Sequence, residues 1–443
     1  MTESTQRAPS RRGRVRRFRL RVVGGPHANT EMVSAGERLV IGTHRSADFH
    51  LVDKTMSRFH CEIVIEDGRA IIRDLGSLNG TIVDGLGVLG AYLGERAILT
   101  LGGTQIVFEL GKDDDDIEIE LHDGDRFGLL VGASRPMRAA MALLARAAKN
   151  DLAVLLHGET GTGKDTAAES IHRESARREG PLVVVDCASV PGPQLERELF
   201  GDGDRIGAFE AATGGTLVLD EVGEIPLEVQ PIVLRAIENR QPMKARPGEP
   251  PARTREIDLR LIATTTRNLR QEVNAKNFRS DLYYRLAVLE IALPPLRQRA
   301  EDLPLLVEEL LRAHGEVPGG GAARLREPTS IAELQRHAWP GNVRELANYV
   351  ERCLAFAEPP PLAGDAAAAP NESRVDAGKP LRVERERWLR RFEREYLEQL
   401  LAAHGGNVSA AARTAGVDRI HLYRLLWRAG LREVGAPQSA KSR

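Results

Sequence analysis

Two short segments of the chain carry residue types that suit phosphate chemistry. The first, GETGTGKD at residues 158–165, follows an apolar run and precedes a segment typical of a helix. Its glycines would let the backbone wrap closely around phosphates, the helix N-terminus would offer free N–H groups, and Lys164 would reach the outer phosphates. The Ser or Thr that usually follows the lysine is Asp165 here. A glycine-rich turn without a ligand is the alternative, but the order strand, loop, helix favours a phosphate-binding loop.

The second segment, TLVLDE, is an apolar run that ends in Asp220 and Glu221. At the end of a buried strand, one carboxylate can hold Mg²⁺ while the next orients or deprotonates an attacking water. An acidic pair that caps the next helix is the alternative. The phosphate loop upstream favours a site that binds ATP and Mg²⁺, with Asp220 as the metal ligand.

Three arginines further along the chain are candidates for contact with a nucleotide. Arg279 and Arg285 lie in NFRSDLYYRL, and Arg344 lies in HAWPGNVREL. An arginine supplied to a phosphoryl group neutralises charge in the transition state. For any one arginine taken alone, a salt bridge on a helix surface is the competing interpretation.

Residues 16–110 alternate short strand-like runs with turns and predict a small β-sandwich. Loops at one end of such a sandwich can present the hydroxyl of Ser57, the guanidinium of Arg58 and the amide of Asn79 together. These groups suit a phosphate and the peptide backbone beside it. A sandwich that makes protein contacts without phosphate is the alternative.

The segment 397–431 predicts three helices joined by turns. Asn407 and Asp418 are candidate N-caps, and Gly416 is a candidate helix end. With the leucines of the last helix packed inward, Arg419, His421 and Arg424 would face a major groove and Arg428 a phosphate. A three-helix oligomerisation bundle is the alternative.

The elements that must position these residues divide the chain into six segments. Apolar runs between 153 and 293 predict buried parallel strands that alternate with helices. The predicted segments are a disordered basic tail (1–15), an all-β sandwich (16–110), an acidic linker (111–128), an α/β domain (129–356), a second linker (357–385) and an all-α helix-turn-helix (386–433).

The composition limits the classes of protein to be considered. The 62 Lys and Arg balance the 63 Asp and Glu, so any nucleic-acid site must be local, as in the basic C-terminal segment. Three distant cysteines predict neither a disulfide framework nor a metal site. No apolar run approaches the roughly 18 residues that span a membrane, and the Arg-rich start is not a signal peptide. We therefore expect a cytoplasmic protein without a membrane partner.

The α/β segment resembles the AAA+ domain of bacterial enhancer-binding proteins, the sigma-54-dependent activators. The resemblance spans about 129–356 and rests on GETGTGKD, ELFG, GGTLVLDE, FRSDLYYRL, LPPLRQRAEDL and WPGNVREL in order. It implies an ATPase with a helical lid that works as a homo-oligomer, from a dimer to a hexameric ring. By resemblance, Lys164, Asp220, Glu221, Arg279 and Arg285 serve catalysis, the two arginines acting on a neighbour's ATP. The nucleotide contacts that it implies are Gly158, Glu159, Thr160, Gly161, Thr162, Gly163, Lys164, Asp165, Thr265, Thr266 and Arg344.

Two residues of this segment depart from the family pattern. Asp165 stands where the family usually has Glu, which is a conservative change. Asp186 replaces an Asn that pairs with the catalytic glutamate in much of the family. We expect an ionised Asp186 to repel Glu221 unless a proton or cation intervenes.

The loop by which this family contacts sigma-54 is expected to be missing. Between ELFG and a later GGTL segment, relatives insert a surface loop that carries GAFTGA. Here only residues 202–206 separate ELFG from GAFEAATGGTL, which aligns with the later segment. The alternative is a degenerate loop with GAFEAA at its tip, which leaves nothing to align with that segment.

The two flanking domains each resemble a known family. Residues 16–110 resemble a forkhead-associated (FHA) domain, which implies phosphothreonine-peptide binding by Ser57, Arg58 and Asn79. The partner would be a phosphothreonine protein such as a Ser/Thr kinase. The family's GR is Gly42-Thr43 here, and Arg45 is the candidate substitute for the lost arginine. Residues 397–431 resemble the Fis-type helix-turn-helix of the same activators.

The sequence predicts a DNA-binding transcriptional regulator with an ATP-hydrolysing ring that is gated by phosphopeptide binding. Its partners would be enhancer or promoter DNA and RNA polymerase holoenzyme, with sigma-54 contact doubtful in the absence of the loop. The alternative, from another class, is a phosphosignalling scaffold that binds ATP with little turnover.

Overall fold

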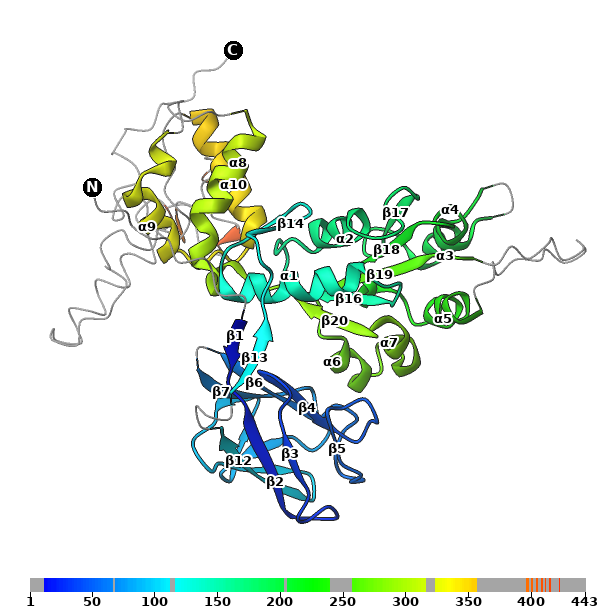
Figure 1. The fold of residues 1–443 in the computed structure, drawn as a ribbon, viewed down its shortest axis with the longest axis vertical. Coiled ribbons are helices and arrows are strands. Elements are labelled where there is room, and N and C mark those ends of the chain that lie inside the picture. Colours follow the sequence, from blue (N-terminus) through cyan, green and yellow to red (C-terminus); the bar gives the residue numbers. More distant parts are fainter. Residues whose placement is uncertain are drawn as a thin grey trace, which may run out of the picture. The chain divides into compact units, whose positions relative to one another are not determined.

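In a computed structural model of the chain, the described residues are 12–66, 68–111, 116–202, 205–239, 257–315 and 323–356, with isolated positions between 396 and 422. The chain divides into two compact units, Met1–Pro360 and Pro361–Arg443. The first unit holds a β-sandwich, an α/β domain and a group of lid helices (Figure 1). The multidomain fold class predicted from the sequence is confirmed.

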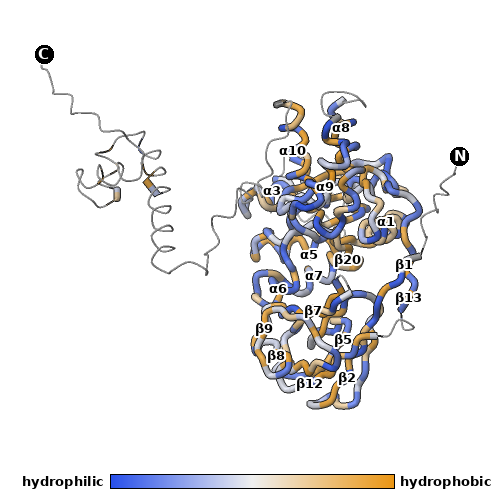
Figure 2. The backbone as a smooth tube through the Cα atoms, turned by 90° about the vertical axis from the view of Figure 1, so that its left-hand side faces the viewer, coloured by the Kyte–Doolittle hydropathy of each residue, from blue (hydrophilic) through white to orange (hydrophobic). Residues whose placement is uncertain are grey.

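The β-sandwich consists of two mostly antiparallel sheets, with strand orders β10-β7-β6-β4-β5 and β3-β2-β12-β11-β8-β9. Alternate side chains of β2, such as Phe18, Leu20 and Val22, are buried between the sheets because successive residues of a strand face opposite sides. Hydrophobic and hydrophilic residues accordingly alternate along these strands in Figure 2. The strands are β2 Phe18–Gly24, β3 Glu31–Val33, β4 Arg38–Gly42, β5 Phe49–His50, β6 Cys61–Glu66, β7 Arg69–Asp74, β8 Thr81–Val83, β9 Leu86–Val88, β10 Gly90–Tyr92, β11 Ile98–Leu101 and β12 Thr104–Leu110.

The predicted tail and the predicted acidic linker both contain regular structure. Strand β1 (Arg12–Val15) pairs antiparallel with β13 (Ile117–Glu120), and Val15 is buried. A short hairpin of β14 (Arg126–Phe127) and β15 (Leu130–Val131) follows. Disorder over 1–15 is therefore wrong for Arg12–Val15, since basic residues of one strand align with Glu118 and Glu120 of the other.

The α/β domain is built on a five-stranded parallel sheet with the order β17-β18-β19-β16-β20. Leu217 and Leu219 of β18 belong to one apolar cluster and Val218 to another, so helices cover both faces of the sheet (Figure 1). The strands are β16 Val154–His157, β17 Leu182–Asp186, β18 Thr216–Asp220, β19 Arg260–Thr265 and β20 Leu289–Ala292. The helices are α1 Arg135–Ala148, α2 Lys164–Arg173, α3 Gly192–Phe200, α4 Ala208–Ala211, α5 Gln230–Asn239, α6 Leu269–Asn274 and α7 Ser280–Leu286.

Three lid helices follow the sheet: α8 Leu303–Ala313, α9 Pro328–Arg336 and α10 Asn342–Phe356. The lid is joined to the α/β domain by the buried Asp302. Its carboxylate accepts hydrogen bonds from the N–H groups of Ala133 and Ser134 at 2.7 and 2.6 Å, and from the Ser134 hydroxyl at 2.8 Å. Because Ser134 is also the N-cap of α1, the start of α1 and the start of the lid share one polar cluster.

In the second unit only isolated positions are described. Their buried side chains are Leu397, Leu400, Val408, Ala411 and Leu422, and Leu422 was predicted to pack inward. Within the described part of the chain, no helix is long and apolar enough to cross a membrane.

Candidate functional site

The glycine-rich loop lies between the end of β16 and the start of α2 (Lys164–Arg173). Gly161 and Gly163 have φ angles of 79° and 102°, which glycine adopts without strain. A Cβ at Gly161 would also come within 2.3 Å of the Gly341 carbonyl oxygen of the lid. The loop is thus shaped for close backbone approach, and the lid packs directly on it.

Lys164 is almost fully buried inside this loop. Its Nζ donates to the carbonyl oxygens of Gly158 and Glu159 at 3.2 and 3.4 Å. The same Nζ lies 3.5 Å from a carboxylate oxygen of Glu221. The structure therefore brings together the predicted lysine, at the start of α2, and the predicted catalytic glutamate, directly after β18.

Asp220 and Glu221 accept hydrogen bonds from different threonines at the end of the neighbouring strand β19 (Arg260–Thr265). The Thr264 hydroxyl donates to Asp220, and the N–H and hydroxyl of Thr266 donate to Glu221 at 2.8 and 2.9 Å. Glu221 has a left-handed φ of 52°, which turns the chain sharply after the strand. Burial raises the pKa of Asp220, and the nearby carboxylates of Asp165, Glu221 and Asp186 raise it further. A cation between these groups would relieve their repulsion.

Asp186 does not act on Glu221 in the way that the sequence suggested. Its carboxylate accepts hydrogen bonds from the Ser189 hydroxyl and from the N–H groups of Ala188 and Ser189. These bonds, that of the hydroxyl first, lower the pKa of Asp186. Its nearest strand neighbour is Asp220 rather than Glu221. The expected repulsion is therefore directed at the predicted metal ligand.

Thr265 and Thr266 have different roles at the end of β19. The Thr265 hydroxyl accepts the N–H of Arg267 at 3.1 Å, and its carbonyl accepts the N–H of Gly158 at 3.3 Å. Thr265 therefore positions the loop backbone, whereas Thr266 holds Glu221.

The lid contributes contacts to the loop that the site prediction missed. Arg297 forms a two-pronged ion pair with Glu159 at 2.6 and 2.7 Å, and lowers the pKa of that carboxylate. Arg299 donates to the Thr162 carbonyl at 2.8 Å, and Asn342 donates to that of Thr160 at 3.0 Å. The sequence signal was present, because these residues lie in LPPLRQR and PGNVREL.

Arg344 lies where the sequence placed it, beside the loop. A Cβ on Gly161 would come within 3.0 Å of the Arg344 Cβ, so this part of the lid lies against the loop. The Arg344 side chain is exposed.

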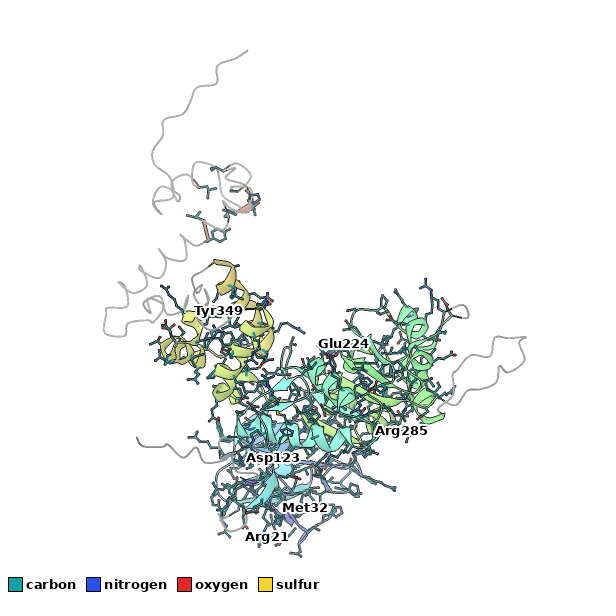
Figure 3. All side chains as sticks on the ribbon, turned by 45° about the horizontal axis from the view of Figure 1, so that its top comes forward. Arg21, Met32, Asp123, Glu224, Arg285 and Tyr349 are labelled. Atoms are coloured by element: carbon teal, nitrogen blue, oxygen red, sulfur yellow. The ribbon has the colours of Figure 1, made fainter. Side chains whose placement is uncertain are left out.

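Arg279 and Arg285 flank helix α7 (Ser280–Leu286) and are both exposed. Arg279 pairs with Asp281 at 2.7 Å, and this hydrogen-bonded pair raises the pKa of the arginine. Among the described residues, Arg285 has no ion pair or hydrogen-bond partner, and it lies at the edge of the α/β domain (Figure 3). Neither arginine contacts the glycine-rich loop of its own chain.

The connection between α3 and α4 is closed tightly at its base. Phe200 and Phe209 stack with ring centroids 5.2 Å apart. Gly207 lies so close to Gly201 that a Cβ on it would be 2.4 Å from the Gly201 nitrogen. The end of α3 and the start of α4 therefore lie close together, and only residues 201–207 connect them.

The predicted phosphopeptide residues lie in loops of the β-sandwich, and Arg45, Arg58 and Asn79 are exposed. The Ser57 hydroxyl accepts the N–H of Leu78 at 2.9 Å, which joins two of these loops. The Asn79 amide donates to the Thr55 carbonyl at 2.7 Å. The loops are thus tied together while the guanidinium of Arg58 is left open to solvent.

The predicted DNA contacts Arg419, His421, Arg424 and Arg428 lie outside the described residues. Family models nevertheless match four parts of the chain in the predicted order. They are the FHA domain at 39–102, the sigma-54 interaction domain at 130–292, the AAA+ ATPase lid domain at 297–366 and the bacterial regulatory protein, Fis family, at 389–426.

Curated relatives agree with these models. The transcriptional regulatory protein ZraR of Escherichia coli is 38% identical over 316 residues, which cover 69% of each chain. The chain belongs to the family of transcriptional regulators with a sigma-54 interaction domain. The chain is also 37% identical over 338 residues to the nitric oxide reductase transcription regulator NorR2 of Cupriavidus necator, and spans 64% of that protein's length. A crystal structure of NtrX from Brucella abortus in complex with ATP is 36% identical, covers 69% of this chain and 70% of that one, and has a TM-score of 0.48.

Proposed function

We propose that this regulator binds and hydrolyses ATP at the interface between two copies of itself, and that it acts on transcription through DNA bound by its Fis-type segment. The observation that carries this proposal is the contact between the buried Lys164 and Glu221, 3.5 Å apart, in a loop built for phosphate. A lysine and a positioned carboxylate in this arrangement serve phosphoryl transfer to water.

The described residues fit ATP with Mg²⁺. Loop N–H groups and Lys164 would hold the phosphates, Asp220 would hold the ion, and Glu221 would orient the water. Within the described part of the chain, no cluster of three or more His, Cys, Asp or Glu side chains is arranged to hold a metal alone. Mg²⁺ commonly needs only one or two carboxylates, because the nucleotide phosphates supply further oxygens.

The positions of the two arginines support assembly. Arg279 and Arg285 do not reach the phosphate loop of their own chain, and both are exposed. An arginine supplied by a neighbouring subunit would complete the site and make hydrolysis depend on oligomerisation.

The short connection between α3 and α4 supports a difference from other sigma-54 activators. Gly201 and Gly207 meet at its base, and only residues 202–206 separate ELFG from the GAFEAATGGTL segment in the sequence. Five residues that read DGDRI cannot carry a GAFTGA tip to sigma-54. We expect the ATPase cycle to drive or report assembly at DNA.

The FHA loops support a phosphothreonine input. Arg58 is exposed and uncommitted beside the Ser57 hydroxyl and the Asn79 amide, which are the groups that suit a phosphate next to a peptide backbone. Arg45 would supply the second cation that Thr43 cannot.

A mixing experiment tests the shared ATP site. Lys164→Ala and Arg285→Ala are each expected to lose ATP turnover. An equimolar mixture should recover part of it, because some interfaces combine the intact loop of one variant with the intact arginine of the other. Arg235→Ala, a change at another exposed arginine of the domain, serves as the control and should retain the wild-type rate.

Three results would count against the proposal. Turnover that does not depend on protein concentration would exclude a shared site. Wild-type turnover in Arg285→Ala would exclude the arginine. No turnover at any concentration, with ATP still bound, would identify the chain as a nucleotide-binding scaffold.

A further inference from the structure

The β-sandwich packs against the α/β domain through three apolar side chains that are almost completely buried. Val40, Phe59 and Leu75 have exposed fractions of 1%, 0% and 0%, and they belong to the same apolar cluster as the core of the α/β domain. The α/β-domain residues that contact the sandwich here include Asn274 of α6 (Leu269–Asn274), Tyr283 of α7 and Glu290 of β20 (Leu289–Ala292). We call this contact the docking interface.

Asn274, the last residue of α6, holds two loops of the sandwich at once. Its side-chain amide donates to the carbonyl oxygens of Phe59 and Leu75, the latter at 2.8 Å. The Oδ1 atom of the same side chain accepts the N–H of Phe59 at 3.5 Å. Phe59 directly follows Arg58, and Leu75 begins the loop that carries Asn79. One side chain of the ATPase domain thus fixes the bases of both proposed phosphopeptide loops.

The same side chain is close in sequence to the arginines proposed to act in trans. Residues 275–279 connect α6 to α7, and Arg279 is the N-cap position of α7. The Arg279 N–H donates to the Gln230 side chain at 2.8 Å, which anchors this end of the helix. A displacement of Asn274 would therefore be passed to Arg279 through a short, hydrogen-bonded segment.

The other end of α7 meets the sandwich through aromatic contacts. His44 stacks on Tyr284 with ring centroids 4.2 Å apart, and Phe59 meets the edge of Tyr283 at 5.6 Å. Tyr284 directly precedes Arg285. Both ends of the arginine-bearing helix are therefore held by residues that adjoin the phosphopeptide loops.

A network of partly buried charges joins the sandwich to the glycine-rich loop as well. Glu290 of β20 pairs with Arg270 at 2.6 Å and with Arg38 of the sandwich at 3.4 Å. The same carboxylate lies 3.4 Å from His157, which directly precedes Gly158. Arg38 is itself held by Glu62 at 2.7 Å.

We propose that the docked FHA domain is a support for the arginine-bearing helix, and that phosphopeptide binding at Arg58 and Asn79 raises ATP turnover through the Asn274 contact. Docking leaves Arg58, Leu78 and Asn79 exposed while Phe59 and Leu75 are buried, so the docked state already presents the peptide loops. A peptide that holds these loops together reduces the entropy cost of docking, and it therefore favours the docked state. This inference rests on the proposed phosphothreonine and ATPase functions and adds how they are coupled.

The coupling has a reciprocal consequence. If phosphopeptide raises the affinity for an ATP analogue that stabilises the hydrolysing arrangement, then the analogue must raise phosphopeptide affinity by the same factor. A coupling of 1–2 kcal/mol corresponds to about five- to thirtyfold.

The test uses the full chain with a pool of phosphothreonine peptides that have degenerate flanking positions, and the same pool without phosphate. Asn274→Ala removes the contacts to both loops. Asn277→Ala is the matched control, because Asn277 lies in the same connection but its amide bonds only Glu272, at 2.9 Å, among the described residues. Asn274→Asp, which keeps the size but places a carboxylate against two carbonyl oxygens, is a second variant in case the first is poorly folded.

We expect the phosphorylated pool to raise turnover about fivefold or more in the wild type and in Asn277→Ala. The Asn274 variants should still bind the pool, but their turnover should respond by less than about twofold. Hydrogen exchange at the Phe59 amide should be faster in both Asn274 variants, since its protection depends on docking.

The outcomes separate this proposal from the function on which it rests. An Asn274 variant that responds to the pool like the wild type would overturn the coupling. Unchanged exchange at Phe59 would overturn the docking contact without any reference to turnover. Failure of every protein to bind the pool would remove the phosphothreonine input, and the coupling with it, while the exchange result would still report on docking.

Discussion

The two loop regions proposed to bind phosphate are positioned by different kinds of side chain. The glycine-rich loop is stabilised by ion pairs: the buried Lys164 lies beside Glu221, and Arg297 pairs with Glu159. The FHA loops are held by the neutral amide of Asn274, and their charged residue, Arg58, is free in solvent. The first region is organised for chemistry, because its charges are fixed before a ligand arrives. The second is organised for recognition, because its cation is fully available to a partner.

The largest effect that this comparison predicts concerns Glu221. Glu221→Gln removes the carboxylate that would orient or deprotonate water, and leaves an amide of the same shape between Lys164 and Thr266. We expect ATP turnover to fall about 100-fold or more, as is typical for loss of a general base. Calorimetry should show ATP binding retained. A variant that keeps more than about a tenth of the wild-type rate would show that this region is not organised for catalysis.

A pH dependence would sharpen the comparison, because partly buried charged groups also lie next to the start of the glycine-rich loop. Burial lowers the pKa of His157 from 6.5 to about 4, against the opposing effect of Glu290, and Arg38 and Arg270 lower it further. Between these values the unfolded chain binds a proton that the folded chain does not, so the free energy of unfolding must decrease as the pH falls from about 6.5 toward 4. Between pH 7 and pH 5 we expect a loss of about 2 kcal/mol.

His157→Gln isolates this contribution. Urea unfolding at pH 7 and pH 5 should show a smaller loss of stability in the variant than in the wild type, by about the same 2 kcal/mol. If the free energy of unfolding falls equally in the two proteins, the pKa of His157 is not lowered on folding. The charges of Glu290, Arg270 and Arg38 would then not act on His157 as described.

A third prediction concerns the exposed cation of the FHA loops. Arg58→Ala should weaken binding of phosphothreonine peptides by about tenfold or more, since a hydrogen bond to a charged group contributes about 1.5–3 kcal/mol. The melting temperature should hardly change, because the described Arg58 side chain is exposed and has no partner to lose. Titration of labelled peptide measures the affinity.

Arg45→Ala serves as the comparison for Arg58→Ala. A loss of similar size would support Arg45 as the substitute for the arginine missing at Thr43. If Arg45→Ala binds like the wild type and Arg58→Ala does not, the site uses one cation only.

The smallest effect is expected for Asp186→Asn, which restores the residue common in the family. Its carboxylate accepts hydrogen bonds from Ser189 and from two backbone N–H groups, and its partner on the neighbouring strand is Asp220. We expect turnover to change by less than about threefold, measured at saturating ATP and protein. A tenfold gain would restore the view that Asp186 impairs Glu221 directly.

Much of the nucleotide site could be predicted because its parts are local. The run 153–157, the glycines at 161 and 163, and the helix after Lys164 each follow from residues close in sequence. The contacts of Arg297 and Arg299 with the loop were not predicted, although their motif was recognised. Their partners, Glu159 and Thr162, lie far away in the chain, and spacing alone does not pair such residues.

The sequence by itself determined the three kinds of domain, the phosphate loop and the acidic pair at the end of β18, because hydrophobic period and glycine placement act over a few residues. Only the tertiary structure decided that β1 pairs with β13, that Asp186 turns to Ser189, and that the FHA loops rest on α6 and α7. The physical reason is that these contacts depend on which surfaces bury each other after the domains have formed. Asn274 and Phe59 are 215 residues apart, and no local preference of either residue indicates the other.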